Sequence, residues 1–240
     1  MFTHYRSEGL ILKKIDRGEA NQLLTIYTKD FGKLEILGKA IRKISSKLRA
    51  GAEVFYLSEI EFIQGKNYKT LTDAVLINKF PDIQNNLNGL KTAHLIARMT
   101  DKLVKGEEPD GRLWRLLRKT FQVLNSHSLS VDRYSLIYYY FLWNFFSLLG
   151  YCPQLQHCSL CQNKLNPERV FFNLKEGGLV CDKCSKKQKD SKKIHQDVVK
   201  ILRLFLGKDW EVVKNLKILP LDKKALEDIS QDYLSDFIKE

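Results

Sequence analysis

The stretch Glu53-Val-Phe-Tyr-Leu-Ser-Glu-Ile-Glu-Phe-Ile63 decides the fold of the first third of the chain. Its apolar and acidic side chains alternate, and a period of two residues predicts a strand with one buried face. The apolar positions of that face are Val54, Tyr56, Ile60 and Phe62, opposite Glu53, Glu59 and Glu61. The sequence Gln64-Gly-Lys-Asn67 then predicts a hairpin turn into another strand over residues 68–77.

Three more β-rich runs precede this hairpin, so residues 1–80 predict five strands. The runs cover residues 9–15, 22–28 and 33–41, with turn signals at Asp16-Arg-Gly-Glu19 and Asp30-Phe-Gly32. Five short strands fit a small antiparallel barrel, and the oligonucleotide-binding (OB) barrel is the five-stranded example. An SH3-like barrel would give nearly the same pattern.

After Pro81 the apolar spacing becomes helical. Helices are predicted over residues 83–105, 113–124, 131–149 and 194–205. The last helix is predicted to begin at Asp222 as N-cap, with Leu221 and Leu226 as a hydrophobic staple. The expected fold class is therefore α+β: an OB barrel over residues 1–80, then an α-helical domain in two parts, 81–155 and 187–240.

One predicted helix needs a comparison with a membrane span, because residues 134–149 are strongly aromatic and carry no formal charge. The run is shorter than the roughly 20 residues that a spanning helix needs. It also contains Asn144, and Gly150 and Pro153 follow it. We interpret it as a helix buried on most sides within a globular domain, with a membrane span as the alternative.

Four cysteines in two Cys-x-x-Cys pairs interrupt the helical part, within residues 156–186. They are Cys158, Cys161, Cys181 and Cys184. Two such knuckles supply the four tetrahedral ligands of a structural zinc site, and their spacing is typical of zinc. Unrelated thiols or a redox pair are the alternatives. Cys152 lies outside the pattern, and His157 would be an unusual ligand because it adjoins Cys158.

The chain has a net charge of +12 and a pI near 9.4, which favours an anionic partner such as nucleic acid, an acidic membrane or an acidic protein. The densest basic run, broken only by Glu35, consists of Lys33, Lys39, Arg42, Lys43, Lys47 and Arg49. On a barrel loop, such residues can follow phosphates by charge alone, and we predict DNA contacts for all of them after Lys33. Further predicted contacts are Lys66, Tyr68 and Lys69 at the hairpin and, more weakly, Arg6, Lys13 and Lys14. A solvated basic loop and a packing role for Tyr68 are the alternatives.

Signals of an enzyme are weak. The segment from Gly32 to Lys39 has five residues between its glycines instead of the four of a phosphate-binding loop, and Ala40 replaces the required Ser or Thr. The histidines are scattered, and no carboxylate cluster for the Mg²⁺ of a nuclease is apparent. We therefore expect no catalytic residue. No signal peptide is expected, so the cysteines indicate reduced thiols in a cytoplasm.

Four segments together resemble the bacterial RecO family of recombination mediators. They are Glu19-Ala-Asn-Gln-Leu-Leu-Thr-Ile-Tyr-Thr-Lys-Asp-Phe-Gly-Lys33, Gly38-Lys-Ala-Ile-Arg42 with Ser45-Ser46, Leu148-Leu-Gly-Tyr-Cys-Pro-Gln-Leu155, and Gly177-Gly-Leu-Val-Cys181. Ala40 and Ile41 depart from the usual Gly-Ala, and Gln162 stands where a glycine often follows the first knuckle. The resemblance covers roughly residues 1–206.

The resemblance implies a non-catalytic role in DNA repair and recombination. RecO-like proteins bind single- and double-stranded DNA and anneal complementary strands. With a RecR-type partner they help load recombinase onto DNA coated by single-strand-binding protein, whose acidic tail they contact. A cytoplasmic, nucleoid-associated protein with one structural zinc is expected. The alternative from the same barrel and knuckles is a zinc-ribbon RNA-binding or transcription-associated module.

Overall fold

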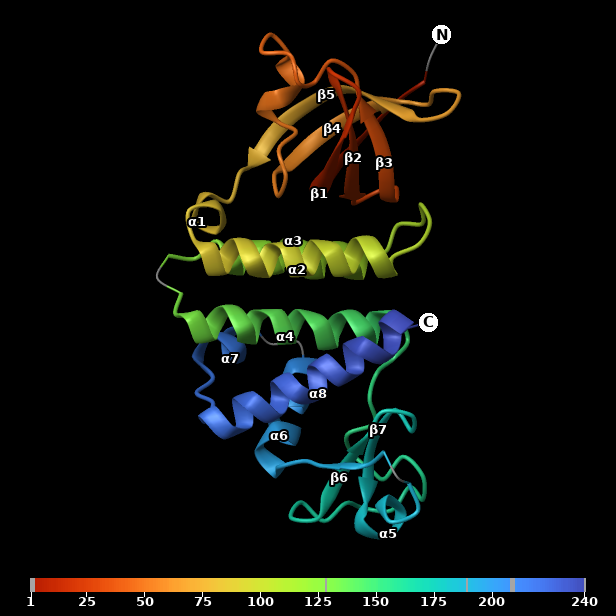
Figure 1. Ribbon diagram of the computed structural model, residues 1–240, viewed down its shortest axis with the longest axis vertical. Coiled ribbons are helices and arrows are strands. Elements are labelled where there is room, and N and C mark those ends of the chain that lie inside the picture. The colour runs from red at the N-terminus through yellow and green to blue at the C-terminus, as the bar shows by residue number, and fades with distance from the viewer. Residues whose placement is uncertain (1–2, 128, 189, 208–209, 240) are drawn as a thin grey trace. The chain divides into compact units, whose positions relative to one another are not determined.

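Five strands close into a barrel in the computed structural model, which describes residues 3–127, 129–188, 190–207 and 210–239 (Figure 1). The strands are β1 (His4–Arg17), β2 (Asn21–Thr28), β3 (Gly32–Gly38), β4 (Leu57–Ile63) and β5 (Lys69–Asn78). Their order around the barrel is β1-β2-β3-β5-β4, and β4 pairs back with β1. All pairs are antiparallel except β3 with β5. This is the topology of an OB barrel, which confirms the predicted fold and replaces the SH3-like alternative.

Inward-facing side chains of these strands fill the barrel. Ile60 and Phe62 of β4 are buried, as the alternation predicted, beside Leu24 and Ile26 of β2. The predicted strand over 53–63 was wrong in its first four residues, because β4 begins only at Leu57. Phe55 has a left-handed φ of +69°, which breaks the alternation: its buried ring lies against His94 and Phe121, while Tyr56 packs against the barrel core.

The chain forms two compact units, Met1–Tyr134 and Ser135–Glu240. The first unit also contains the 3₁₀ helix η1 (Lys47–Ala50) and the helices α1 (Pro81–Gln84), α2 (Leu87–Leu103) and α3 (Gly111–Leu124). The predicted helix over 83–105 is thus split, because Asn86 starts a new helix by accepting hydrogen bonds from the N–H groups of Asn88 and Gly89. Asp110 caps α3 in the same way.

Helices α2 and α3 contact side chains of β1, β2 and β3. The ring of Tyr27 stacks on Trp114 of α3 with 6.5 Å between centroids, and its hydroxyl donates to the Asp110 carbonyl at 3.3 Å. Lys33 of β3 donates to the carbonyl of Asp101 in α2. OB barrels commonly bind oligonucleotides on this β2–β3 face. In this chain its own helices cover part of that face.

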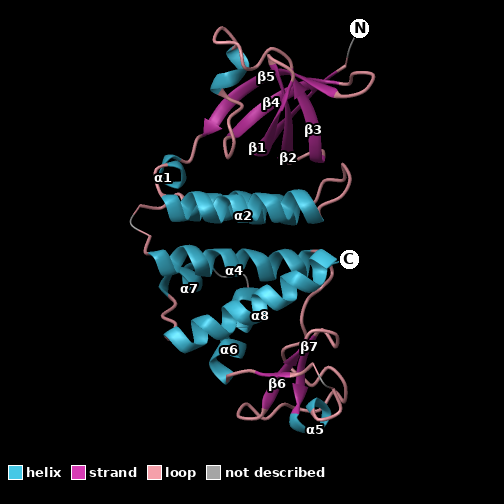
Figure 2. Cartoon of the chain, in the orientation of Figure 1, coloured by secondary structure: helices cyan, strands magenta, loops and turns pink. Residues whose placement is uncertain are grey.

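The second unit combines helices with a small sheet. The elements assigned to it are α4 (Val131–Leu148, which begins at the boundary), β6 (Val170–Asn173), β7 (Gly178–Cys181), α5 (Asp182–Ser185), β8 (Lys192–Lys193), α6 (Gln196–Leu206), α7 (Trp210–Asn215) and α8 (Pro220–Lys239). The sheet order is β7-β6-β8. Figure 2 shows that strands occur in two places, the barrel and this cysteine-bearing segment.

The aromatic helix α4 is buried, as predicted. Trp143 is buried and donates its indole N–H to Ser230 of α8 at 3.0 Å, while its ring lies 4.7 Å from that of Tyr233. The amide of Asn144 donates to the carbonyl oxygens of Tyr140 and Phe205, both at 2.9 Å. No helix within the described residues has the length and apolar character of a membrane span.

The predicted cap of the last helix was wrong. Helix α8 begins at Pro220, so Asp222 lies inside its first turn. Leu221 is exposed and forms no staple. Pro is favourable at a helix start because it has no N–H to leave unpaired, and this moves the start ahead of Asp222. The Asp222 carboxylate instead lies 2.9 Å from Nδ1 of His195.

We predict that Gly32→Ala destabilises the protein much more than Gly18→Ala. Both glycines have left-handed φ values, +64° and +68°, so each alanine carries the conformational strain of about 1 kcal/mol. At Gly32 the new Cβ would also lie 2.4 Å from the Glu108 carbonyl oxygen, whereas nothing lies within 4 Å at Gly18. Overpacking adds about 2 kcal/mol at Gly32. Urea denaturation of both variants measures the difference, and equal losses would contradict the close approach.

Candidate metal centre and nucleic-acid interface

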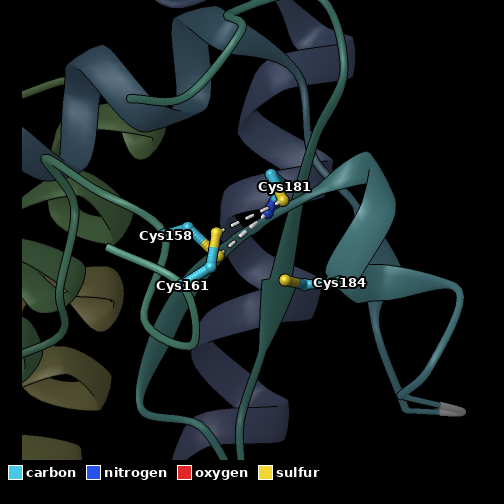
Figure 3. Close-up of side chains that lie close together, drawn as sticks. All are labelled: Cys158, Cys161, Cys181 and Cys184. Carbon is cyan, nitrogen blue, oxygen red and sulfur yellow. Dashed lines mark hydrogen bonds between the residues drawn. The ribbon is translucent and has the colours of Figure 1, made fainter. Parts of the chain in front are cut away.

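Four cysteine side chains converge in the second unit. Cys158 and Cys161 come from the turn before β6, Cys181 ends β7, and Cys184 lies in α5. Their sulfurs all lie within 4.8 Å of one another, and those of Cys161 and Cys181 are 3.8 Å apart. Figure 3 shows the four side chains pointing into one small space. The structure thus brings together all four predicted residues.

Backbone contacts hold the first knuckle against the β6–β7 hairpin. The N–H of Ser159 donates to the carbonyl of Leu179 at 2.8 Å, and the N–H of Leu179 donates to that of Gln154 at 2.9 Å. A Cβ on Gly178 would lie 2.4 Å from the Gln154 carbonyl oxygen, so only glycine permits this approach. Gly177 turns the chain just before with a φ of +63°. Gly178 therefore permits the close approach to Gln154, and Gly177 provides the turn before it.

The electrostatics of the cluster favour one thiolate at Cys158. Burial of this thiol raises its pKa, but backbone N–H groups of Cys161, Cys181 and Leu160 donate to the sulfur and together lower the pKa to about 6. The N–H of Cys181 lies 3.4 Å from this sulfur. The pKa of Cys184 is raised to about 12, first by its hydrogen bond to Cys181 and then by burial.

The sulfur spacing fits a tetrahedral metal ion. With metal–sulfur bonds of about 2.3 Å, tetrahedral geometry places neighbouring sulfurs about 3.8 Å apart. The Cys161–Cys181 distance is 3.8 Å, and small side-chain rotations bring the other sulfurs into range. Cys152 and His157 are not members of the cluster. The cluster therefore can hold a metal ion with four thiolate ligands.

The basic loop, which we define as residues 39–49 between β3 and β4, exposes five basic side chains. They are Lys39, Arg42, Lys43, Lys47 and Arg49. Only Arg42 has a carboxylate nearby, that of Asp16 at 3.3 Å. The other four have no carboxylate within 4.0 Å in the described part of the chain. This loop thus presents uncompensated positive charge.

Lys33, the remaining member of the densest run, is not part of this surface. It lies on β3 and its ammonium is 3.7 Å from the Asp101 carboxylate, in addition to its bond to the carbonyl. Its side chain is 17% exposed, so these two contacts with Asp101 hold it away from most of the solvent.

Several other predicted contacts are already neutralised. Arg6 pairs with Glu61 at 3.0 Å, and hydrogen bonds from His4, Arg6 and Thr72 lower the pKa of Glu61 to about 2. Lys13 pairs with Asp101 at 3.3 Å.

Two predicted lysines are also largely buried. Lys14 lies 3.0 Å from Glu53 and its side chain is 11% exposed, while Lys69 lies 2.6 Å from Glu107 at 16% exposed. Lys66 and Tyr68 are exposed at the β4–β5 turn, and Tyr68 is 43% exposed. Of the hairpin residues, these two are open to a ligand.

One basic surface was missed by the sequence reasoning. Helix α2 exposes Lys91, Leu95, Arg98 and Lys102 along one side, which we name the α2 stripe. Within the described residues, its three basic side chains have no carboxylate partner. Their spacing of seven and four residues places them on one helical face, and this spacing was the available signal.

A second group of possible metal ligands lies in the same unit as the cysteines. Nδ1 of His195 is 2.9 Å from Asp222 and 3.6 Å from Asp197. Lys200 also donates to Asp197 at 2.7 Å and is the main cause of the lowered pKa of that carboxyl. The hydrogen bonds and ion pairs of these side chains are therefore made within the group, and they link the starts of α6 and α8.

Comparisons with known proteins cover nearly the whole chain. The family model "Recombination protein O N terminal" matches residues 1–80, and "Recombination protein O C terminal" matches residues 84–238. The chain is 27% identical to the DNA repair protein RecO of Halalkalibacterium halodurans, over 97% of this chain and 89% of that protein. It is 27% identical to the protein of the same name from Thermoanaerobacter sp., over 98% and 92%. The corresponding protein of Moorella thermoacetica is 28% identical, over 98% and 86%.

Proposed function

The chain belongs to the RecO family of recombination proteins, and from this premise we propose that it is a non-enzymatic DNA-binding mediator in DNA repair. The observation that carries the proposal is the basic loop on the OB barrel, where Lys39, Lys43, Lys47 and Arg49 have no carboxylate within 4.0 Å among the described residues and Arg42 lies near Asp16. Neutralising phosphates with such side chains supplies binding that does not depend on base sequence. Binding of both single- and double-stranded DNA is expected from this mode.

The proposed DNA path runs over loops of the barrel. The β2–β3 face is partly covered by α2 and α3, as the stack of Tyr27 on Trp114 illustrates. The basic loop takes the phosphates, and Tyr68 beside Lys66 offers a ring for a base. Arg6, Lys13, Lys14 and Lys69 are weaker contacts, because each must first leave a carboxylate partner.

Annealing of complementary strands requires that two phosphate chains be neutralised at once. The first unit carries two uncompensated basic surfaces, the basic loop and the α2 stripe. We propose that one strand binds each of them. The RNA-binding alternative uses the same charge, so acceleration of DNA renaturation in preference to RNA binding distinguishes the two functions.

The partners follow from the family. We propose that the protein acts with a RecR-type partner, contacts the acidic tail of single-strand-binding protein, and helps load recombinase onto coated DNA in a bacterial cytoplasm, at the nucleoid. An acidic tail with an apolar end needs a basic rim around an apolar surface. Catalysis is not proposed, and an assay for metal-dependent DNA cleavage tests that point.

We propose that Cys158, Cys161, Cys181 and Cys184 hold one structural zinc per chain. Four thiolates leave no open coordination position, which supports a structural role over a catalytic one. The zinc would tie the first knuckle to the β6–β7 hairpin. Most residues of β6 and β7 are buried, and metal binding would add to this packing a further part of the folding free energy of the segment.

Cys181→Ser should lower the zinc content from one ion per chain to nearly none and destabilise the second unit by several kcal/mol, because the metal drives local folding. Cys152→Ser is the matched control, since Cys152 is an exposed thiol outside the cluster. Elemental analysis and thermal unfolding measure both effects. Protein purified without chelators that contains no zinc would contradict the proposal.

Replacement of Arg42, Lys43 and Lys47 by alanine should weaken binding to single-stranded DNA and flatten its salt dependence. Each lost phosphate contact reduces the slope of log K against log salt by about 0.7, so three reduce it by about two units. The control replaces Arg6, Lys13 and Lys14. All three are paired with carboxylates, whereas Arg42 is the one paired member of the first set, so the control should have a smaller effect. Unchanged affinity and slope in the first variant would make the loop a merely solvated surface.

Replacement of Lys91, Arg98 and Lys102 by alanine should slow annealing while single-stranded DNA binding is largely retained. The reason is that the α2 stripe is proposed to hold the second strand and the basic loop the first. Renaturation of two labelled complementary oligonucleotides, followed by fluorescence, measures the rate. If this variant anneals DNA at the original rate, the α2 stripe does not bind the second strand.

A further inference from the structure

One side chain of the basic loop is apolar and stands almost entirely in solvent. Ile44 is 93% exposed, more than any other large apolar side chain that the structure describes. It lies between Lys43 and Ser45. Single exposed apolar side chains are common on protein surfaces, so what points to a ligand is the place where Ile44 stands, between unpaired lysines at the tip of a turn.

The loop holds Ile44 outward by anchoring both of its flanks. Ile41 is buried in the barrel core, and Leu48 is partly buried against the same core. Between them, the N–H of Lys43 donates to the Ala40 carbonyl at 3.1 Å, and the N–H of Ser46 donates to that of Lys43 at 3.0 Å. Ile44 is therefore presented at the tip of a hydrogen-bonded turn.

The surroundings of Ile44 favour a nucleic acid over a membrane. Lys43 and Lys47 flank it and have no carboxylate partner among the described residues. A lipid surface needs a larger apolar area than one isoleucine for stable insertion. In duplex DNA, by contrast, proteins insert single apolar side chains such as isoleucine between base steps, and a single strand needs no unpairing for the same contact. The β-branch also restricts χ1, so the side chain loses little freedom on insertion.

We propose that Ile44 inserts between two neighbouring bases of bound single-stranded DNA, while Lys43 and Lys47 neutralise phosphates beside the gap. This inference rests on the proposed DNA-binding function and adds a contact to bases. Unpaired bases cost the least free energy to unstack, so a single strand is the preferred ligand. The result is a strand whose bases are separated at one step while its backbone follows the basic loop.

The test uses the full chain and an oligonucleotide with one 2-aminopurine between adenines. Unstacking raises the fluorescence of 2-aminopurine, so the original protein at saturation should increase it. Ile44→Ser should abolish the increase at saturation and weaken binding about 5-fold, because an apolar contact is lost. The slope of the salt dependence should not change, since no phosphate contact is removed. Ile44→Leu should retain part of the increase.

The matched control is Leu221→Ser, which removes an 83% exposed apolar side chain from the other unit. It should change neither fluorescence nor affinity. Thermal unfolding should show that both serine variants are as stable as the original, as expected at exposed positions.

Several results would overturn the inference. If the original protein binds the oligonucleotide but Ile44→Ser gives the same fluorescence at saturation, Ile44 is no wedge and the proposed function stands. If the effect appears only with duplex DNA, the single-strand assignment is wrong. If Ile44→Ser loses binding to anionic vesicles but not to DNA, the loop is a membrane contact. If the original protein binds no DNA, the proposed function and this inference fail together.

Discussion

The packing of α2 and α3 against β1, β2 and β3 is the contact on which the arrangement of the first unit depends. Tyr27 and Trp114 stack across this boundary, and the missing side chain of Gly32 lets the β2–β3 turn approach Glu108. The contact stabilises the helices, yet it takes part of the face that an OB barrel commonly offers to oligonucleotides. In the proposed DNA path the phosphates are therefore bound by loops, and the longest of these carries the uncompensated charge.

Charge in this protein is better described by its pairing than by its amount. Lys14 and Lys69 count toward the net charge of +12, but each lies against a glutamate and is largely shielded from solvent. The lysines of the basic loop have the same formal charge and no such partner. A paired lysine must give up its partner before it binds a phosphate, so the free energy gained is smaller. Local pairing therefore selects which basic residues can act.

The cysteine-bearing segment combines a small sheet with a set of four possible metal ligands. Its sheet consists of two four-residue strands and one of two residues, and most residues of the two longer strands are buried. Backbone N–H groups directed at Cys158 favour the thiolate, and the sulfur spacing suits a tetrahedral ion. The local backbone thus prepares a ligand set before any ion is bound.

Much of this structure was predictable from the sequence because its signals are local. Alternation in β4, the helical stripe ending at Leu124 and the spacing of the four cysteines each depend on a few neighbouring residues. The break at Asn86 and the left-handed Phe55 were missed, since a cap or a single positive φ leaves little trace in a hydrophobic pattern.

Only the tertiary structure decided which lysines pair with carboxylates, as with Lys69 and Glu107, because such partners lie far apart along the chain. It also decided that Ile44 faces solvent while Ile41 is buried. The two residues are chemically identical, and what separates them is which way an anchored loop turns each side chain.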